Sequence, residues 1–287
     1  GETFEVGARA VVNAAGPWLD DVRRLEDGRA GTSVTLSRGA HLVLERAGGW
    51  EAALTVPIDR TRVAFAVPWA GRLLLGTTDS AFEGDARSIR PTAAEERQIL
   101  AEAGIALEPE ALGAVCARFA GVRVLPAGTG ATERAQRETV LTSGPLGMVS
   151  VAGGKLTTYR RIALAVLHTL RSELELHRID RRPRPLPGAA DPGVAADALL
   201  RRHPGLEPRL AAHLAGAYGA LAGEVIAAGP LEPLGDGLLE VEAQVLYARE
   251  REWALGAEDV LRRRTTLSVT GRDSDEVRRR VEAVLAS

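Results

Sequence analysis

The sequence is poor in cysteine, in lysine and in long apolar runs. Its single cysteine, Cys116, excludes an intramolecular disulfide and a cysteine cluster for zinc or iron–sulfur, and favours a reducing compartment. No window holds the roughly 18 apolar residues of a membrane-spanning helix, and the first residues lack the basic and apolar regions of a signal peptide. We therefore expect a cytoplasmic protein that at most lies on a membrane surface.

An excess of positive charge is also lacking. The formal net charge of the 287 residues is −2 and the pI is about 6.3, so no global positive field attracts nucleic acid. Hydrophobic residues make up 45% of the chain and charged residues 26%, which is typical of a soluble globular protein. The length predicts one large domain or two to three smaller ones.

Lysine is the scarcest cation. Lys155 is the only lysine among 36 basic residues, which leaves 35 arginines. Surface positions usually accept either cation, so a lysine kept against this bias answers a specific need. Lysine offers a compact ammonium on a flexible stem, whereas arginine offers a wide fork.

The pattern of apolar residues predicts three regions. Short strands are expected at 3–7 and 8–14, and a glycine turn then leads to a helix that carries Trp18, Val22 and Leu25. Between residues 34 and 151 the pattern predicts a mostly antiparallel sheet, interrupted by a helix over 93–103 with the capping-box pair Thr92 and Glu95. The expected strands of that sheet are 34–36, 41–45, 62–67, 72–76, 121–125, 139–142 and 148–151.

The last part of the chain is expected to be helical. A long helix is predicted over 155–174, followed by a linker over 179–193 that is rich in arginine and proline. Helical spacing of apolar residues then predicts an all-α domain over 194–287. Trp253 in this domain is interpreted as a packing residue.

Gly153-Gly154-Lys155 joins a predicted strand to a predicted helix. Two glycines before a helix let the backbone approach a ligand closely, and the first N–H groups of a helix carry partial positive charge. The corner therefore predicts a site that attracts negative charge. A simple structural turn is the alternative.

Several blocks in the same order resemble FAD-dependent glycerol-3-phosphate dehydrogenase, a member of the D-amino-acid-oxidase-like flavoprotein superfamily. The resemblance covers nearly the whole chain. Its blocks are Val12-Asn13-Ala14-Ala15-Gly16-Pro17-Trp18, Ser37-Arg38-Gly39-Ala40-His41, Gly76-Thr77-Thr78-Asp79, Gly121-Val122-Arg123, Gly153 to Arg160, and Glu242 to Thr265.

The resemblance implies a mixed α+β and α/β fold. Residues 1–33 and 145–178 would form a partial, Rossmann-like FAD-binding domain. This domain would be interleaved with an antiparallel-sheet substrate domain over 34–144. A small all-α C-terminal domain would follow the linker.

The resemblance also implies a reaction. Hydride would leave C2 of glycerol 3-phosphate for flavin N5, which yields dihydroxyacetone phosphate, and the electrons would pass to a quinone. Peripheral contact with the cytoplasmic face of the inner membrane is typical of the family, and a homodimer is compatible with it. No metal is expected.

Four residues are expected at the substrate. Lys155 matches the family's active-site lysine, Arg123 its substrate-binding arginine, and His41 an active-site histidine. Arg137 resembles a second phosphate-binding arginine in a short, degenerate block. Whether His41, Lys155 or a residue upstream is the catalytic base stays open. Val124 follows Arg123 where the family commonly has proline.

The expected cofactor contacts lie at the two glycine corners. They are Asn13, Ala14, Ala15, Gly16, Gly153, Gly154, Leu156 and Thr157. Asp79 is interpreted as a turn or cap residue without a catalytic role.

The family's Gly-x-Gly-x-x-Gly fingerprint for the FAD pyrophosphate does not occur in the sequence. We therefore expect that an N-terminal segment is missing and that this polypeptide alone binds FAD poorly. Three alternatives remain: a glycerol-3-phosphate oxidase with oxygen as the acceptor, an amine or amino-acid oxidase of the same superfamily, and a non-catalytic remnant without cofactor.

Overall fold

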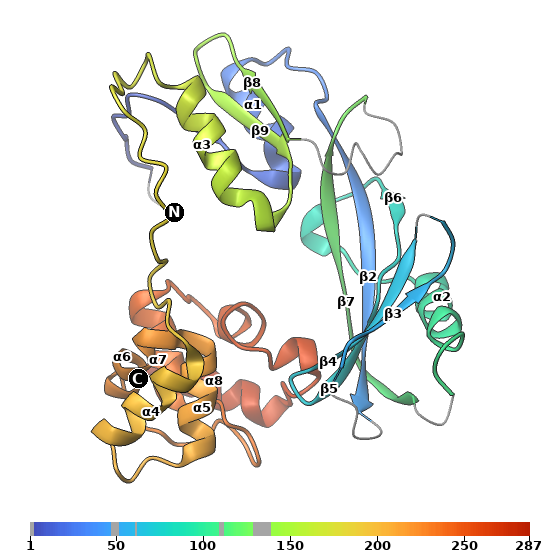
Figure 1. Cartoon of the computed structure of the whole chain (residues 1–287), viewed down its shortest axis with the longest axis vertical. Helices are drawn as coiled ribbons and strands as arrows, with labels where there is room; N and C mark the ends of the chain where they lie inside the picture. Colours follow the sequence, from blue (N-terminus) through green and yellow to red (C-terminus); the bar gives the residue numbers. More distant parts are fainter. Residues whose placement is uncertain (1–2, 47–51, 61, 109–111, 129–138) are drawn as a thin grey trace. The chain divides into compact units, whose positions relative to one another are not determined.

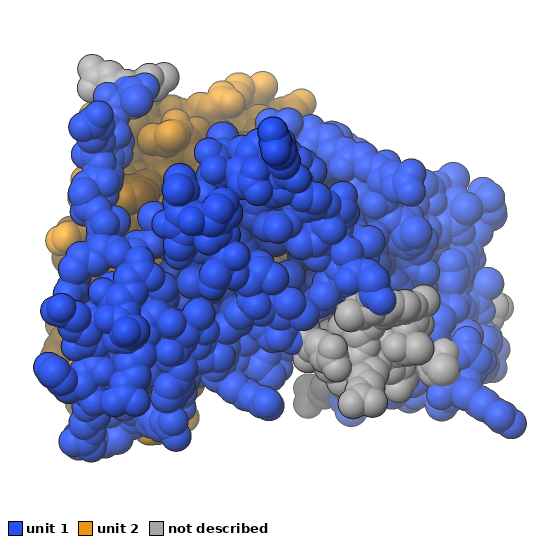
Figure 2. Space-filling model, turned by 90° about the horizontal axis from the view of Figure 1, so that it is seen from above, with its two compact units in different colours: residues 1–182 blue, residues 183–287 orange. Residues whose placement is uncertain are grey.

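The chain divides into two compact units, Gly1–Arg182 and Pro183–Ser287 (Figures 1 and 2). Their structure comes from a computed structural model, which describes residues 3–46, 52–60, 62–108, 112–128 and 139–287. The boundary between the units falls inside the predicted linker over 179–193.

Unit 1 contains a three-stranded sheet with a helix on each face (Figure 1). Its strand order is β1-β9-β8, with β1 parallel to β9 and β8 antiparallel to it. Along β9 the side chains alternate, so Ala152 packs with Leu19 of α1 whereas Val149 packs with Val166 of α3. The elements are β1 (Val12–Asn13), α1 (Leu19–Glu26), β8 (Thr139–Ser143), β9 (Val149–Gly153) and α3 (Tyr159–Thr169), with short 3-10 turns η1 (Gly16–Trp18) and η5 (Leu156–Thr158).

Three predictions for this region were wrong in detail. Residues 3–7 form no strand, and only Val12–Asn13 pairs with a neighbour. The helix that was expected over 155–174 begins at Tyr159 and ends at Thr169. Finally, β8 and β9 belong to the three-stranded sheet and not to the larger antiparallel sheet in which strands 139–142 and 148–151 were expected, because a tight turn joins the two strands and β9 pairs with β1.

The larger sheet of unit 1 is built around β2 (Val34–Arg46), which continues through both strands expected there. Its order is β3-β4-β5-β2-β6, and β7 (Leu112–Pro126) pairs along the free side of β2. The strand pairings of this sheet are antiparallel among the described residues, as predicted. The other strands are β3 (Leu54–Pro57), β4 (Val63–Trp69), β5 (Arg72–Gly76) and β6 (Ser80–Phe82).

The two faces of β2 have different characters. Ala40, Leu42 and Leu44 point into an apolar core that includes Ile99 and Ala103 of α2 (Ala93–Ala103). Because successive side chains of a strand alternate between faces, residues 37, 39 and 41 point to the opposite face. Helix α2 has the predicted bounds, and its capping box of Thr92 and Glu95 is present. A short 3-10 turn, η2 (Ala86–Ser88), precedes it.

Unit 2 is all helical, as expected, with two apolar cores. Trp253 does not pack, since 86% of its surface is exposed. The elements are α4 (Pro192–Arg202), α5 (Pro208–Tyr218), η6 (Gly219–Leu221), α6 (Ala222–Ala227), α7 (Glu242–Arg251), the π-helix η7 (Asp259–Arg264), η8 (Ser268–Thr270) and α8 (Asp275–Ala286).

One stretch of unit 2 is long and apolar enough to cross a membrane by length and composition alone. It spans Pro208–Ala227 and has a mean hydropathy of 1.3. This corrects the expectation that no such segment exists. However, Gly219 interrupts the stretch with φ of +54°, and Leu214 and Ala215 within it belong to an apolar core of unit 2. Only part of the stretch, 28%, is buried in the structure.

Candidate active site

The glycine corner after β9 requires glycine at two positions. Gly153 and Gly154 have φ of +73° and +87°, a region that favours glycine. A Cβ on Gly154 would also lie 2.5 Å from Cδ1 of Ile162. Beyond the corner, the Thr158 hydroxyl accepts a hydrogen bond from the Lys155 backbone N–H (3.2 Å) and donates one to the Lys155 carbonyl (2.9 Å). This turn starts the helical segment and presents the exposed Lys155 side chain just before it.

The corner after β1 is held by Asn13, which is almost fully buried. Its side-chain amide donates to the Leu19 carbonyl (2.9 Å) and to the Ser150 hydroxyl (3.3 Å), and its carbonyl accepts from the Ala15 N–H (3.2 Å). Asn13 therefore fixes the turn itself. Gly16 follows with φ of +58°.

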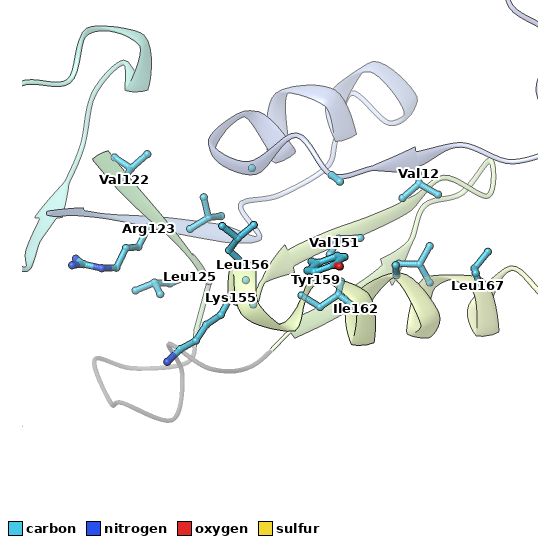
Figure 3. A pocket seen from close by; sticks show the side chains of 17 residues that line it. Val12, Val122, Arg123, Leu125, Val151, Lys155, Leu156, Tyr159, Ile162 and Leu167 are labelled. Atoms are coloured by element: carbon cyan, nitrogen blue, oxygen red, sulfur yellow. The ribbon is translucent and has the colours of Figure 1, made fainter. Parts of the chain in front are cut away.

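A cavity of about 1290 Å³ lies between these two corners and strand β7 (Figure 3). Aliphatic side chains form most of its wall, and the side chains of Arg123 and Lys155 lie at one end, whereas Val12 and Leu167 lie at the other. Of the expected cofactor contacts, five line the cavity and Asn13, Ala15 and Thr157 do not. The five are Ala14, Gly16, Gly153, Gly154 and Leu156.

The wall of this cavity is unusually apolar for a surface. Leu156 is 89% exposed and Tyr159, Val12 and Leu167 are also exposed. Exposed apolar patches of this kind mark a surface that a ligand or a further part of a protein covers.

Arg123 is held by polar groups from two segments, β2 and residues 77–79. It lies directly opposite Ser37 in the β2–β7 ladder. One terminal nitrogen of its guanidinium, Nη1, donates to the Ser37 hydroxyl, the Thr78 carbonyl and Asp79 Oδ1, each at 3.4 Å. The other, Nη2, donates to the Thr77 hydroxyl (3.3 Å) and the Thr78 carbonyl (3.4 Å). The Ser37 hydroxyl in turn donates to Asp79.

The guanidinium of Arg123 also lies close over the backbone of Gly39. A Cβ on Gly39 would lie 2.9 Å from Nη2 of Arg123 and 2.8 Å from Oγ1 of Thr77. A Cβ at these distances would be closer than van der Waals contact, so a larger residue here would displace Thr77 or the guanidinium of Arg123.

His41 lies on the same face of the sheet as Arg123, two residues along β2 from Gly39. Its ring stacks on Phe119 with centroids 5.0 Å apart and an interplanar angle of 11°. On its other side a Cβ at Gly76 would lie 2.5 Å from Cδ2 of the imidazole. The imidazole ring therefore lies between the phenyl ring of Phe119 and the backbone of Gly76, which carries no side chain.

The environment of His41 favours the neutral imidazole. Burial lowers the pKa of His41 below 6.5, and the nearby positive charge of Arg123 lowers it further. Nδ1 is buried and has no hydrogen-bond partner among the described residues. Buried polar atoms without partners are rare, and a role in binding or catalysis is one explanation for them.

The structure thus brings His41 and Arg123 together, and it places Lys155 with Arg123 on the cavity. Arg137 lies outside the described residues. Sequence reasoning missed Ser37, Thr77, Thr78 and Phe119, and it took Asp79 for a turn residue although Asp79 pairs with Arg123. Ser37, Thr77 and Thr78 lie inside the blocks that resemble the family, and Phe119 lies beside one of them. This position is the signal that could have identified them.

Comparison with known protein families decides the family of the chain. Residues 1–160 match the model described as FAD dependent oxidoreductase. The chain belongs to this family. Residues 182–287 match the model described as C-terminal domain of alpha-glycerophosphate oxidase. These matches confirm the predicted flavoprotein superfamily and FAD as the cofactor of the family.

Two curated relatives are similar in sequence to most of this chain. The chain is 36% identical over 299 residues to glycerol-3-phosphate dehydrogenase 1 of Mycobacterium tuberculosis, with 96% of this chain and 54% of the relative covered. It is 35% identical over 283 residues to D-erythritol 1-phosphate dehydrogenase of Brucella abortus, with 92% and 56% covered. The chain therefore spans about half the length of the curated relatives that it matches.

A solved structure in this flavoprotein family has the same fold. The glycerol-3-phosphate dehydrogenase from Bacillus halodurans, complexed with FAD, superposes with a TM-score of 0.72 at 25% sequence identity. The match covers 98% of this chain and 59% of that protein. The expected combination of a Rossmann-like region, an antiparallel sheet and a helical C-terminal region is confirmed.

The residues of the cavity fit a flavin. The isoalloxazine ring is flat and largely apolar on its faces, and the wall offers Val122, Val124 and Val151 against it. The glycines at 16, 153 and 154 leave room for close approach. Unlike the aliphatic wall, the start of the helical segment after Lys155 presents partial positive charge, which suits the anionic edge of a reduced flavin.

Proposed function

We propose that this chain carries the substrate site of an FAD-dependent enzyme that oxidises sn-glycerol 3-phosphate to dihydroxyacetone phosphate. The single observation that carries the proposal is that Arg123 and Lys155 border one end of an apolar cavity, while the neutral imidazole of His41 lies on the same face of the sheet as Arg123. The guanidinium suits a phosphate, the neutral imidazole suits an alcohol that loses a proton, and the apolar cavity suits a flavin. The relatives named glycerol-3-phosphate dehydrogenase support the substrate.

Arg123 binds the phosphate in this proposal. Its guanidinium presents a planar fork that matches two phosphate oxygens, and the cradle of Ser37, Thr77 and Asp79 fixes the direction of the fork. Lys155 supplies a second positive charge at the same end of the cavity. Among the described residues none forms an ion pair with its ammonium, so the charge is available to an anionic substrate.

His41 accepts the proton of the substrate hydroxyl. Burial and Arg123 keep its imidazole neutral near pH 7, which is the form that can accept a proton. The stack on Phe119 fixes the plane of the ring. FAD, when bound, supplies the acceptor at N5 for the hydride that leaves C2. The aliphatic wall of the cavity excludes water from this reaction.

The electron acceptor we propose is a quinone, with the protein on the cytoplasmic face of a membrane. Relatives named dehydrogenases support this choice over oxygen, whereas the family model of the C-terminal region is described by an oxidase. Comparing the yield of peroxide with the rate of reduction of a quinone analogue separates the two. Predominant peroxide would overturn the quinone proposal.

The substrate is tested with the complete open reading frame that contains these residues. Purified protein should be yellow, and it should reduce a quinone analogue with glycerol 3-phosphate. D-erythritol 1-phosphate is the second candidate, because the relative of that name is 35% identical. Faster turnover of the erythritol phosphate would replace the substrate, turnover of amino acids alone would favour an amine oxidase, and a colourless protein would favour the remnant without cofactor.

A further inference from the structure

The carboxylate of Glu95 accepts five hydrogen bonds close to the site. Glu95 is the third residue of α2, is 5% exposed and packs against the larger sheet. Its Oε1 accepts from Arg38 Nε (2.9 Å), the Ser80 hydroxyl (3.1 Å) and the Thr78 hydroxyl (3.3 Å). Its Oε2 accepts from the backbone N–H (2.8 Å) and the hydroxyl (2.9 Å) of Thr92.

These five bonds make Glu95 a site for an acceptor only. A glutamine has one carbonyl oxygen and one NH₂ group. In either orientation of the amide, the NH₂ group would therefore face neighbouring groups that are themselves donors. The positive charge of Arg38, which is one-fifth exposed, would also lose its counterion. A change of one atom at Glu95 therefore rearranges its neighbours, although the outline of the side chain stays the same.

Thr78 links Glu95 to Arg123 through hydrogen bonds. Its side chain is 1% exposed, and its hydroxyl donates to Glu95 while accepting from the backbone N–H of Ala40 (2.9 Å). Its main-chain carbonyl accepts from both terminal nitrogens of Arg123. One residue thus bonds to the α2 carboxylate through its side chain and to the guanidinium through its backbone.

We propose that Glu95 is a positioning residue for Arg123, acting through Thr78. The inference rests on the proposed role of Arg123 as the phosphate ligand. The Thr78 carbonyl accepts from both arms of the guanidinium, so its direction sets the direction of the fork. Glu95 fixes that direction by anchoring the Thr78 side chain to the start of α2.

The chain offers a matched control on the same helix. Glu102 is also buried, and Arg62 Nη2 donates to both of its oxygens at 2.8 and 3.1 Å. Gln98 donates to it as well (2.8 Å). In the described part of the chain, no hydrogen bond or ion pair joins Glu102 to Thr78 or Arg123. Glu102→Gln therefore breaks a comparable ion pair without disturbing the cradle.

The first experiment reads the position of Arg123 without catalysis. In the 287-residue chain, the titration of the His41 ring protons is followed by NMR in wild type, Glu95→Gln and Glu102→Gln. Arg123 lowers the pKa of His41, so displacement of the guanidinium in Glu95→Gln should move that pKa upward, toward 6.5. The Glu102→Gln chain should titrate as wild type does. Equal titration of His41 in all three chains would overturn the inference.

The second experiment uses the complete open reading frame and steady-state kinetics. We expect Glu95→Gln to raise KM for glycerol 3-phosphate about tenfold while kcat changes less than about twofold, because a phosphate contact acts on bound substrate and transition state alike. Glu102→Gln should change neither KM nor kcat, even if it lowers Tm as much as Glu95→Gln does. In an Arg123→Gln background, Glu95→Gln should add nothing to KM.

Two results separate the inference from the proposed function. If wild type does not oxidise glycerol 3-phosphate, or Arg123→Gln leaves KM unchanged, the proposed function fails and the His41 titration still decides the placement of Arg123. If Glu95→Gln does not fold, Thr78→Val carries the test, since it removes the hydroxyl and keeps the carbonyl. Thr78→Val should behave as expected of Glu95→Gln, and Thr78→Ser should restore wild-type behaviour; a wild-type Thr78→Val would also overturn the inference.

Discussion

His41 and Phe119 stack ring on ring across the β2–β7 ladder, with centroids 5.0 Å apart and planes 11° from parallel. The two residues are direct partners in the register of the ladder, so the backbone hydrogen bonds of the sheet bring the rings together. A phenyl ring on one side and the Gly76 backbone on the other restrict the imidazole to one plane. This restriction suits a group that must meet a substrate hydroxyl in one orientation.

Removing the stack should slow the reaction. In Phe119→Leu the imidazole of His41 gains rotational freedom, so we expect kcat to fall about tenfold, a part of the roughly 10²- to 10⁴-fold that a general base contributes. Phe119→Tyr keeps the ring and serves as the control, with kcat within about twofold of wild type. Steady-state kinetics of the complete protein measures both. Equal kcat values for the leucine and tyrosine variants would argue against the orienting role of Phe119.

Adding one methyl group at Gly39 should destabilise unit 1. The new Cβ of Gly39→Ala would meet Thr77 and Arg123 at 2.8–2.9 Å, so we expect the free energy of unfolding to fall by about 1–3 kcal/mol. Gly121→Ala is the matched control, because Gly121 is the ladder partner of Gly39 and its added Cβ meets nothing within 4 Å. Denaturant unfolding of the 287-residue chain measures both variants. A Gly39→Ala chain as stable as Gly121→Ala would contradict the close seating of the guanidinium.

The pH dependence of kcat/KM should report the coupling of His41 to Arg123. The neutral imidazole is the active form, so activity is lost as the pH falls through the pKa of His41. Burial and Arg123 place that pKa below 6.5, so wild type should remain active down to about pH 6.5 and lose activity only below it. In Arg123→Gln the Coulombic contribution disappears, and the acid limb should move upward.

The same variant should bind substrate more weakly. Hydrogen bonds to a charged group contribute about 1.5–3 kcal/mol, so Arg123→Gln should raise KM about 10- to 100-fold. Arg123→Lys keeps the charge and loses the fork, which should leave the acid limb closer to wild type while KM still rises. An acid limb at the same pH in all three proteins would exclude the coupling.

Replacing Lys155 should separate the effect of its positive charge from the effect of the shape of its head group. Lys155→Ala should lower kcat/KM about 100-fold, a typical loss for a group that stabilises charge in a transition state, while the flavin absorbance stays unchanged. Lys155→Arg should recover part of that loss, because the charge returns on a wider head group. Arg161→Ala is the control, since Arg161 is an exposed cation of α3 outside the cavity wall. Near-normal turnover of Lys155→Ala would refute the role of the lysine.

Some of this architecture could be predicted because it depends on neighbours in the sequence. The capping box of Thr92 and Glu95 fixes the start of α2, and both ends of that helix agree with the prediction. The glycines at 153 and 154 occupy left-handed backbone that few other residues adopt. Helical spacing of apolar residues was enough to predict that unit 2 is all helical.

Other features could not be predicted because they depend on partners far away in the chain. Residues 3–7 have a strand-like pattern, yet they pair with no described strand, and a strand needs a partner for its backbone hydrogen bonds. Asp79 looks like a turn residue, but folding brings it to Arg123, 44 positions away. Trp253 looks like a core residue and remains exposed.

The sequence by itself determined the family, the local helix and turn signals, and the residue types at the site, including the single lysine, because these depend on short-range backbone preferences and on matched blocks. Only the tertiary structure decided how those residues meet. The register of β2 with β7 and β5 places Phe119 and Gly76 on either side of His41 and sets Arg123 opposite Ser37. A shift of one residue in that register would turn each of these side chains to the other face of the sheet, and no local signal in the sequence fixes it.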